Sequence, residues 1–112
     1  MNITHYWANK LFDFQFRSAA LAKPTAWHLA AFTTAPTAVA GSGVEVTGGS
    51  YARVACAPSD SNWYSTNGTL SGNSSGTSAQ TSNGILLTFA TPTADWGVIN
   101  GLGWFDASTG GN

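Results

Sequence analysis

The residues that could carry out chemistry are few, and the sequence keeps them apart. Acid–base catalysis could draw only on His5, His28 and five Asp or Glu residues. His5 falls in the first turn of a predicted helix and His28 in a predicted strand, and local spacing pairs neither with a carboxylate. A metal site would need a third ligand from these few carboxylates, and the glycine pairs lack the lysine of a phosphate loop. We therefore expect no catalytic site, no metal and no cofactor, and we interpret both histidines as structural or solvent-facing.

Cys56 is the single cysteine, so the chain has neither an internal disulfide nor a cysteine-based zinc site. It lies in the middle of a predicted strand, between two alanines. No His or Lys stands beside it in the sequence to activate the thiol. We interpret Cys56 as a small buried side chain rather than as a nucleophile.

The aromatic side chains are the feature with the widest functional range, since 112 residues include five Trp, three Tyr and six Phe. Flat aromatic faces bind sugars in carbohydrate-binding proteins, and aromatic side chains also fill cores and interfaces. Trp63 and Tyr64 stand between polar residues and precede a polar tract, so they are the candidate ligand-facing pair. Four other aromatic residues lie in or beside predicted strands and are interpreted as core or interface: Trp27, Trp96, Trp104 and Phe105.

The charge content excludes two classes of partner. Charged residues make up 8% of the chain and the net charge is -1, whereas globular proteins average about 25% charged residues. Four Lys and Arg are too few to neutralise a row of phosphates, and no apolar stretch approaches the ~20 residues of a membrane span. We expect no nucleic-acid partner, no membrane partner and, from the N-terminal residues, no signal peptide. At this length we expect one domain over residues 1–112.

The element that must position the first aromatic residues is a helix predicted over residues 4–20. Thr4 is a suitable N-cap because its hydroxyl can accept a free first-turn N–H. Asp13 and Arg17 are four residues apart and are predicted to form an ion pair. Pro24 excludes helical continuation, since proline disfavours helical geometry in the preceding residue. A broad apolar face needs a covering sheet, helix or subunit: it comprises Trp7, Leu11 and Phe14, with Ala8, Phe12 and Phe16 beside them.

After Pro24 the apolar period changes to two, which indicates strands. Strands are predicted at residues 27–32, 44–46 (a short edge strand), 51–57, 85–89 and 98–105. In the third of these, Ala52, Val54 and Cys56 are expected to point inward, and Tyr51, Arg53 and Ala55 outward. Gly48 and Gly49 predict a tight turn before it, and residues 65–83 predict a solvated loop or polar hairpin. The predicted fold is all-β, a mainly antiparallel β-sandwich or barrel-like domain, with one N-terminal amphipathic helix.

Five ordered segments resemble a known family: NKLFD at residues 9–13, WHLAAFTTAPT at 27–37, EVTGGSYAR at 45–53, TADWG at 93–97 and GWFDASTGGN at 103–112. Together they are similar to a group of small tailed-phage virion proteins labelled tail fibre or virion structural proteins. The resemblance implies a β-rich assembly module, present in many copies in a virion made in the bacterial host cytoplasm, with no cofactor and no active site. Within its motifs Arg53 is placed to pair with Glu45. Members of the group usually continue past TGGN with at least one further apolar strand pair, so this is either a shortened member, whose sheet is expected to keep an open edge, or an incomplete sequence.

The expected function is therefore that of a non-enzymatic tail, tail-fibre or connector component. It would pack apolar and aromatic surface against copies of itself, as a trimer, and against other virion proteins. The candidate interface residues are Trp7, Leu11, Phe14, Trp96 and Trp104. A capsid decoration protein is one alternative. Another is a glycan-binding β-sandwich module that reads a host-surface glycan through Trp63 and Tyr64, and an enzyme is the third.

Overall fold

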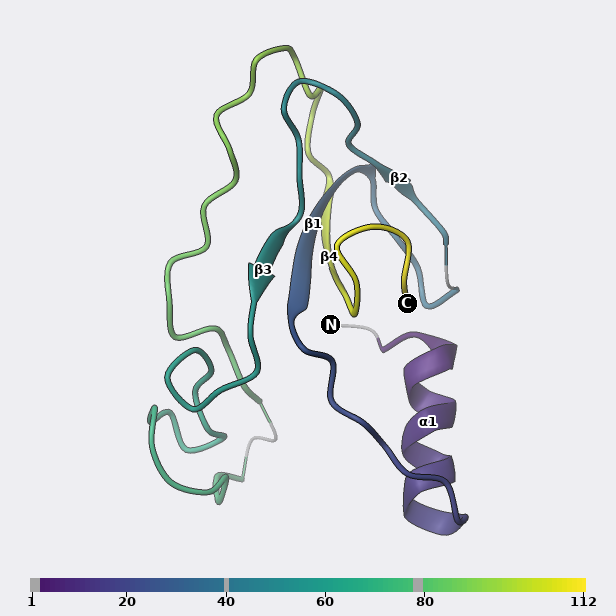
Figure 1. Ribbon diagram of the computed structural model, residues 1–112, viewed down its shortest axis with the longest axis vertical. Helices are drawn as coiled ribbons and strands as arrows, with labels where there is room; N and C mark the ends of the chain where they lie inside the picture. The colour runs from purple at the N-terminus through teal and green to yellow at the C-terminus, as the bar shows by residue number, and fades with distance from the viewer. Residues whose placement is uncertain (1–2, 40, 78–79) are drawn as a thin grey trace.

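The computed structural model describes residues 3–39, 41–77 and 80–112. Along the chain it forms one helix and four strands, α1 (His5–Phe16), β1 (Trp27–Thr34), β2 (Val44–Glu45), β3 (Val54–Cys56) and β4 (Gly101–Phe105), as Figure 1 shows. All strand pairs are antiparallel. The predicted fold class, mainly antiparallel β-structure with one N-terminal helix, is confirmed.

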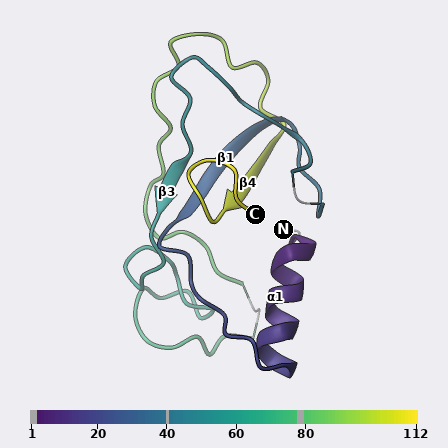
Figure 2. The same cartoon turned by 45° about the vertical axis from the view of Figure 1, so that its right-hand side comes forward.

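Strand β1 is the centre of the sheet and pairs with each of the other three strands. Phe32 is paired with both Glu45 of β2 and Gly101 of β4, and Leu29 with both Val54 of β3 and Trp104 of β4. Because a strand has only two edges, β4 takes one edge of β1 while β2 and β3 share the other. Figure 2 shows β1 beside β4, with β3 on the opposite side of β1 from β4.

The gap between β2 and β3 on their shared edge is closed by other polar groups. The amide of Val46 donates to the carbonyl of Ala31 (3.0 Å), and the amide of Ala31 donates to the Tyr51 hydroxyl (2.9 Å). A side chain thus takes the place of a missing ladder partner, as a buried backbone amide requires. The chain between β2 and β3 can therefore turn away from the sheet while the amide and carbonyl of Ala31 in β1 remain hydrogen-bonded.

The predicted turn at residues 48–49 is confirmed. Gly48 and Gly49 both have positive φ, 72° and 54°, and the amide of Tyr51 donates to the carbonyl of Gly48 (2.8 Å). At Gly49 a Cβ would lie 2.8 Å from Trp96 Nε1, the same nitrogen that donates to the Gly49 carbonyl (2.9 Å). Only glycine meets both conditions here, left-handed backbone and close approach of an indole.

Three predicted strands are shorter or differently used in the structure. The segment at 51–57 pairs only over β3, and the segment at 98–105 only over β4. Residues 85–89, all of them described, form no strand. Instead Phe89 stacks on Tyr51 at 6.0 Å while Leu86 is exposed. The apolar alternation there serves side-chain packing rather than backbone pairing, which composition alone does not distinguish.

The predicted facing of residues 51–57 is correct only for its last residues. Cys56 is buried and Ala55 is exposed, as expected, but Ala52 is exposed and Tyr51 and Arg53 are half-buried. The reason is polar: the Tyr51 hydroxyl reaches Ala31, and the Arg53 guanidinium reaches Glu45. These bonds hold both long side chains against the sheet.

The helix begins as predicted and ends early. The Thr4 hydroxyl accepts the Trp7 amide at 3.4 Å, and Asp13 pairs with Arg17 at 3.3 Å, so the cap and the ion pair are confirmed. The predicted end at residue 20 is wrong, since Arg17 is already extended. Short helices depend on tertiary packing, and Ser18, Ala19 and Ala20 bring little apolar surface to pack.

The molecule is open for its size. Its radius of gyration is 15.4 Å, against about 13 Å for a compact domain of this length. Its accessible surface is 7436 Å², against about 5800 Å² for a compact monomer of 11.6 kDa. The buried apolar core is correspondingly small: Ala30, Ala31, Phe32, Val46 and Cys56. Much apolar surface therefore stays uncovered.

Candidate functional site: an apolar groove beside the helix

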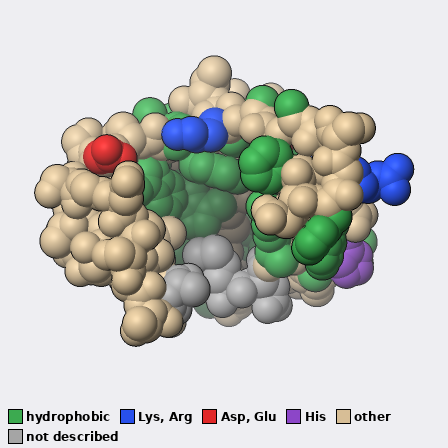
Figure 3. Space-filling view, turned by 90° about the horizontal axis from the view of Figure 1, so that it is seen from below, with side chains coloured by type: hydrophobic (Ala, Val, Ile, Leu, Met, Phe, Trp, Pro, Cys, Tyr) green, Lys and Arg blue, Asp and Glu red, His purple; other side chains and the backbone are tan. Residues whose placement is uncertain are grey.

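A groove of about 1150 Å³ lies between α1, the sheet and the polar loop that follows β3. In Figure 3, which looks up from below, hydrophobic side chains line a hollow with a mostly polar lobe on its left. Figure 1 places that loop and α1 on opposite sides at the same end of the molecule. We call this feature the groove.

One face of the sheet supplies the floor of the groove. Leu29 is directly opposite Trp104, and Ala31 directly opposite Leu102, so these side chains share a face. Trp63, from the loop, packs on Trp104 with ring centroids 5.0 Å apart and planes at 55°. Leu102 nevertheless remains 58% exposed. The floor is therefore apolar, aromatic and open to solvent.

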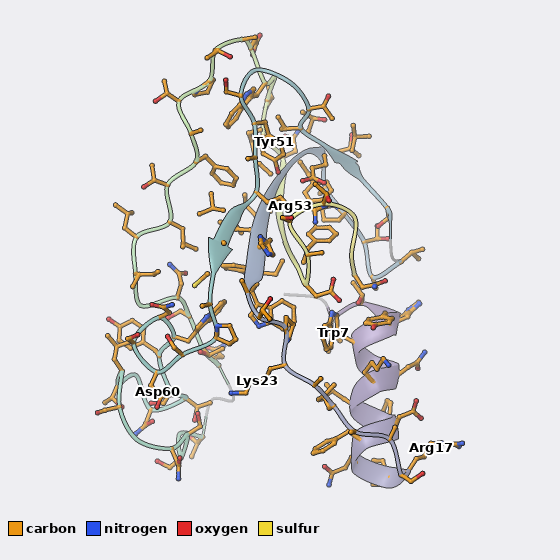
Figure 4. The ribbon with its side chains drawn as sticks, in the orientation of Figure 1. Trp7, Arg17, Lys23, Tyr51, Arg53 and Asp60 are labelled. Atoms are coloured by element: carbon orange, nitrogen blue, oxygen red, sulfur yellow. The ribbon has the colours of Figure 1, made fainter. Side chains whose placement is uncertain are left out.

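Helix α1 forms one wall and is held by its first turn. Trp7 packs on Trp27 at 5.1 Å, and its Nε1 donates to the Asn112 carbonyl at 3.2 Å. The His5 amide donates to the Ala38 carbonyl at 3.1 Å. Across α1, which the structure describes in full, no residue is buried. Figure 4 shows Trp7 between the helix and the sheet, with Arg17 at the far, free end.

The groove is almost free of charge. Among the described residues that line it, only Lys23 and Asp60 are charged. Figure 4 shows Asp60 on the loop and Lys23 on the segment that joins α1 to β1. An uncharged apolar floor with one charge of each sign is typical of the centre of a protein–protein interface, and it offers little for binding a charged small molecule.

A brace behind the groove fixes the C-terminal residues. The Arg53 Nε donates to Glu45 Oε1 (2.8 Å) and its Nη2 to Oε2 (2.7 Å), which confirms the predicted pair. The same guanidinium lies 3.9 Å from the centre of the Phe105 ring and donates from Nη1 to the carbonyls of Ala107 (2.9 Å) and Gly110 (2.7 Å). One side chain thus ties residues 45, 105, 107 and 110 together.

The electrostatics of the brace follow from these contacts. Hydrogen bonding to Arg53 lowers the pKa of Glu45 and raises the pKa of the Arg53 guanidinium. Burial, together with donation of its hydroxyl to Glu45 (2.9 Å), raises the pKa of Tyr51 to about 12. All three groups are therefore held in their ordinary charge states at neutral pH. The cluster stabilises structure and has no group poised for proton transfer.

The brace continues to the helix. Asp106 Oδ1 accepts the Asn112 amide at 2.7 Å, and the Asn112 carbonyl accepts Trp7 Nε1. The Arg53 contacts therefore position the same terminal segment on which α1 rests. Two of the segments singled out in the sequence, residues 45–53 and 103–112, meet at this point.

The structure brings together most of the candidate residues. Of the candidate interface set, Trp7, Leu11 and Trp104 line the groove, as do both candidate ligand-facing residues, Trp63 and Tyr64. Two members lie elsewhere: Phe14 is 53% exposed on α1, and Trp96 packs edge-on against Tyr51 at 5.3 Å.

Sequence reasoning missed Leu102 and Lys23 as groove residues. Leu102 was identifiable, because it stands two positions before Trp104 in a predicted strand and so shares its face. Lys23 carries no such signal, since its place depends on where the extended segment after α1 runs.

The remaining chemistry-bearing residues stay apart. His5 is exposed on α1, and His28 lies in β1 opposite Ala55 and Phe105. Cys56 is buried, which raises the pKa of its thiol. Within residues 3–39, 41–77 and 80–112, no three His, Cys, Asp or Glu side chains gather as metal ligands. In that same part of the chain, no helix has the length and apolarity needed to span a bilayer.

Comparison with known proteins identifies the family of the chain. No curated protein and no solved structure matches the chain. A family model described as Gp80, Podophage GP4 fiber I protein gp80, matches residues 2–112, almost the whole length. The chain therefore belongs to this phage fibre family, and it is a structural fibre protein of a tailed-phage virion.

Proposed function

We propose that this fibre protein is a non-enzymatic tail, tail-fibre or connector component that associates with copies of itself as a trimer. It is made in the host cytoplasm and joins other virion proteins through apolar and aromatic contacts. Neither nucleic acid nor membrane takes part. The low charge supports this, because obligate interfaces are more apolar than ordinary surfaces.

The observation that carries the proposal is the uncovered surface. The chain exposes 7436 Å², about 1600 Å² more than a compact monomer of its mass. Large side chains in that surface include Leu11, Phe12, Phe14, Phe16 and Leu102. Large apolar side chains exposed in such an excess of surface mark a site of protein association.

Electron microscopy of the assembled particle tests the position. Antibody against the chain, or fitting of the fold into a map, should place copies on the tail or its fibres in multiples of three. Hundreds of copies over the head surface would instead establish the alternative, a capsid decoration protein. Absence of copies from both the tail and the head surface would contradict both the tail proposal and the decoration alternative.

A glycan-binding role is the second candidate, and a second pocket favours it. Tyr64 lines a pocket of about 390 Å³ together with the polar residues Ser65, Thr66, Gln80 and Thr81. Aromatic faces beside hydroxyl and amide groups suit a sugar. A glycan array should then give binding that Tyr64→Ala and Trp63→Ala both abolish. Because Trp63 packs on Trp104, only Tyr64→Ala separates lost binding from lost packing. Unchanged binding in Tyr64→Ala would reject this site.

A further inference from the structure

Helix α1 carries a second apolar face, which points away from the groove. Phe12 and Phe16 are 62% and 76% exposed and stack on each other at 6.2 Å. At 3.6 residues per turn, Phe16 lies about 180° around the helix from Trp7, and Phe12 about 140°. Trp7 and Leu11 line the groove. We call Phe12 and Phe16 the ridge; it stands on the side of the helix opposite the groove.

A helix with apolar residues on opposite faces is normally a buried helix. One face of α1 already borders the groove, but the described chain places nothing over the ridge, since both phenylalanines are more than half exposed. The ridge and the groove are thus two uncovered apolar surfaces on the same chain. One is convex and the other concave.

We propose that the ridge of one copy occupies the groove of the next copy. This inference rests on the proposed self-association and names the surfaces that carry it. The excess surface, about 1600 Å² over the compact value, equals that of a standard protein interface.

Charge supports a second copy as the occupant. Asp13 and Arg17 flank the ridge and remain partly exposed while paired with each other. The groove has the opposite partner for each, Lys23 and Asp60. A docking helix therefore brings one charge of each sign to a rim with one charge of each sign, so no charge need be buried alone.

The placement of the two surfaces also sets the symmetry. Since the ridge and the groove lie on opposite sides of α1, the contact is head to tail and joins unlike surfaces. Such a heterologous contact closes into a ring when the rotation permits and otherwise continues as an open filament, and the proposed trimer is the closed case.

Cross-linking between cysteines tests this directly. Cys56 is 1% exposed, so reactive thiols come only from introduced residues. Full-length Phe16→Cys and Leu102→Cys proteins are mixed and treated with a short bismaleimide. A covalent dimer is expected in the mixture and in neither protein alone. Leu86→Cys mixed with Phe16→Cys is the matched control, because Leu86 is 90% exposed and lies outside the groove; it should give no product.

Each other outcome overturns the inference in a recognisable way. A dimer of Phe16→Cys alone means that ridges pack on ridges. A chain that carries both Phe16→Cys and Leu102→Cys is tested as well. If it gives a link within one chain and no covalent dimer, α1 folds onto its own groove. No cross-link while sedimentation still gives an oligomer refutes the ridge–groove contact and leaves self-association standing. A monomer by sedimentation refutes the self-association itself.

Substitution of the ridge provides a second measurement. Phe12→Ser combined with Phe16→Ser should weaken association by more than about tenfold, as expected for two aromatic anchors. The free energy of unfolding of the dissociated chain should change little, since both side chains are exposed. Leu86→Ser is the control and should leave association unchanged. Equal association of the double variant and the native chain would overturn the proposal.

Discussion

Arg53 holds more of the molecule together than any other polar residue of the described chain. Its guanidinium bonds both oxygens of Glu45 and two terminal carbonyls, and its side chain is 6% exposed. Replacing Arg53 with Ala leaves the Glu45 carboxylate without its charged partner, although the Tyr51 hydroxyl still donates to it, and removes the donor to the carbonyls of Ala107 and Gly110. We expect a loss of about 3 kcal/mol in the free energy of unfolding, measured by urea denaturation.

The control for Arg53 is the other ion pair. Arg17 is 77% exposed and Asp13 is 47% exposed. Arg17→Ala should therefore cost less than about 0.5 kcal/mol. Similar losses for both arginine variants would mean that the contacts of Arg53 do not hold the terminal segment.

Glu45 makes stability depend on pH in the acid range. Its pKa is lower in the folded chain than its ordinary value of 4.5, chiefly because of Arg53. A carboxylate of this kind contributes stability above its unfolded pKa, and this is lost as the pH falls through the folded pKa. The free energy of unfolding should thus decrease from about pH 5 downward. Glu45→Gln should flatten this decrease; a native profile in that variant would contradict the assignment.

Tyr51 makes the stability of the fold depend on pH in the alkaline range. Its pKa is raised from 10.0 to about 12, so its contribution is complete below pH 10 and is lost as the pH rises toward 12. Tyrosinate absorbance should show one tyrosine ionising late, and Tyr51→Phe should remove it. Because the hydroxyl also serves Ala31 and Glu45, Tyr51→Phe should cost about 1–2 kcal/mol at neutral pH. Late ionisation that persists in Tyr51→Phe would assign it to another residue.

Among the elements, the turn before β3 depends on two glycines for different reasons. A Cβ at Gly48 would meet nothing within 4 Å, whereas one at Gly49 would meet Trp96 Nε1 at 2.8 Å. Both variants to Ala incur the cost of positive φ, about 1 kcal/mol. Only Gly49→Ala adds overpacking, about 1–3 kcal/mol more. Equal losses in the free energy of unfolding for Gly48→Ala and Gly49→Ala, measured by urea denaturation, would show that the Trp96 indole can shift at no energetic cost.

Helix α1 depends on Trp7 for its place. Trp7→Ala removes the packing on Trp27 and the bond to Asn112, while the sheet keeps its own pairs. We therefore expect faster proteolysis in residues 17–26 at little cost to the core. Phe14→Ala is the control because Phe14 is 53% exposed. Unchanged proteolysis in Trp7→Ala would show that other contacts hold the helix.

The elements with local signals were predictable. The Thr4 cap, the Gly48–Gly49 turn and the start of β1 at Trp27 each follow from residues within a few positions of one another. The prediction of a strand at residues 85–89 was wrong because the apolar alternation there fits a strand and a packed extended segment equally. The early end of α1 was not predicted because helix propensity alone allows residues 18–20 to be helical, whereas a short helix is held by packing to which Ser18, Ala19 and Ala20 contribute little.

The groove was predictable only in part. Trp7, Leu11 and Trp104 were identifiable as apolar surface from their spacing, and Leu102 could have been added by strand periodicity. That they face one hollow depends on the loop after β3 folding back, with Trp63 against Trp104. The sequence does not predict this long-range contact, because the polar residues of the loop have no apolar periodicity that would indicate it.

At the scale of the whole molecule, the chain has more apolar surface than its own fold covers. Among the described residues the buried core is four small or medium side chains and one phenyl ring, and no residue of α1 is buried. The chain belongs to a phage fibre family, and the association proposed above, with copies of itself and with other virion proteins, would cover this surface. Self-association is the expected consequence.

Sedimentation equilibrium of the purified chain over a range of concentrations is the most direct test. Completion by neighbours predicts a mass three times 11.6 kDa, reached cooperatively and retained at high ionic strength because the contacts are apolar. A constant mass of 11.6 kDa at the highest concentration attainable would contradict it.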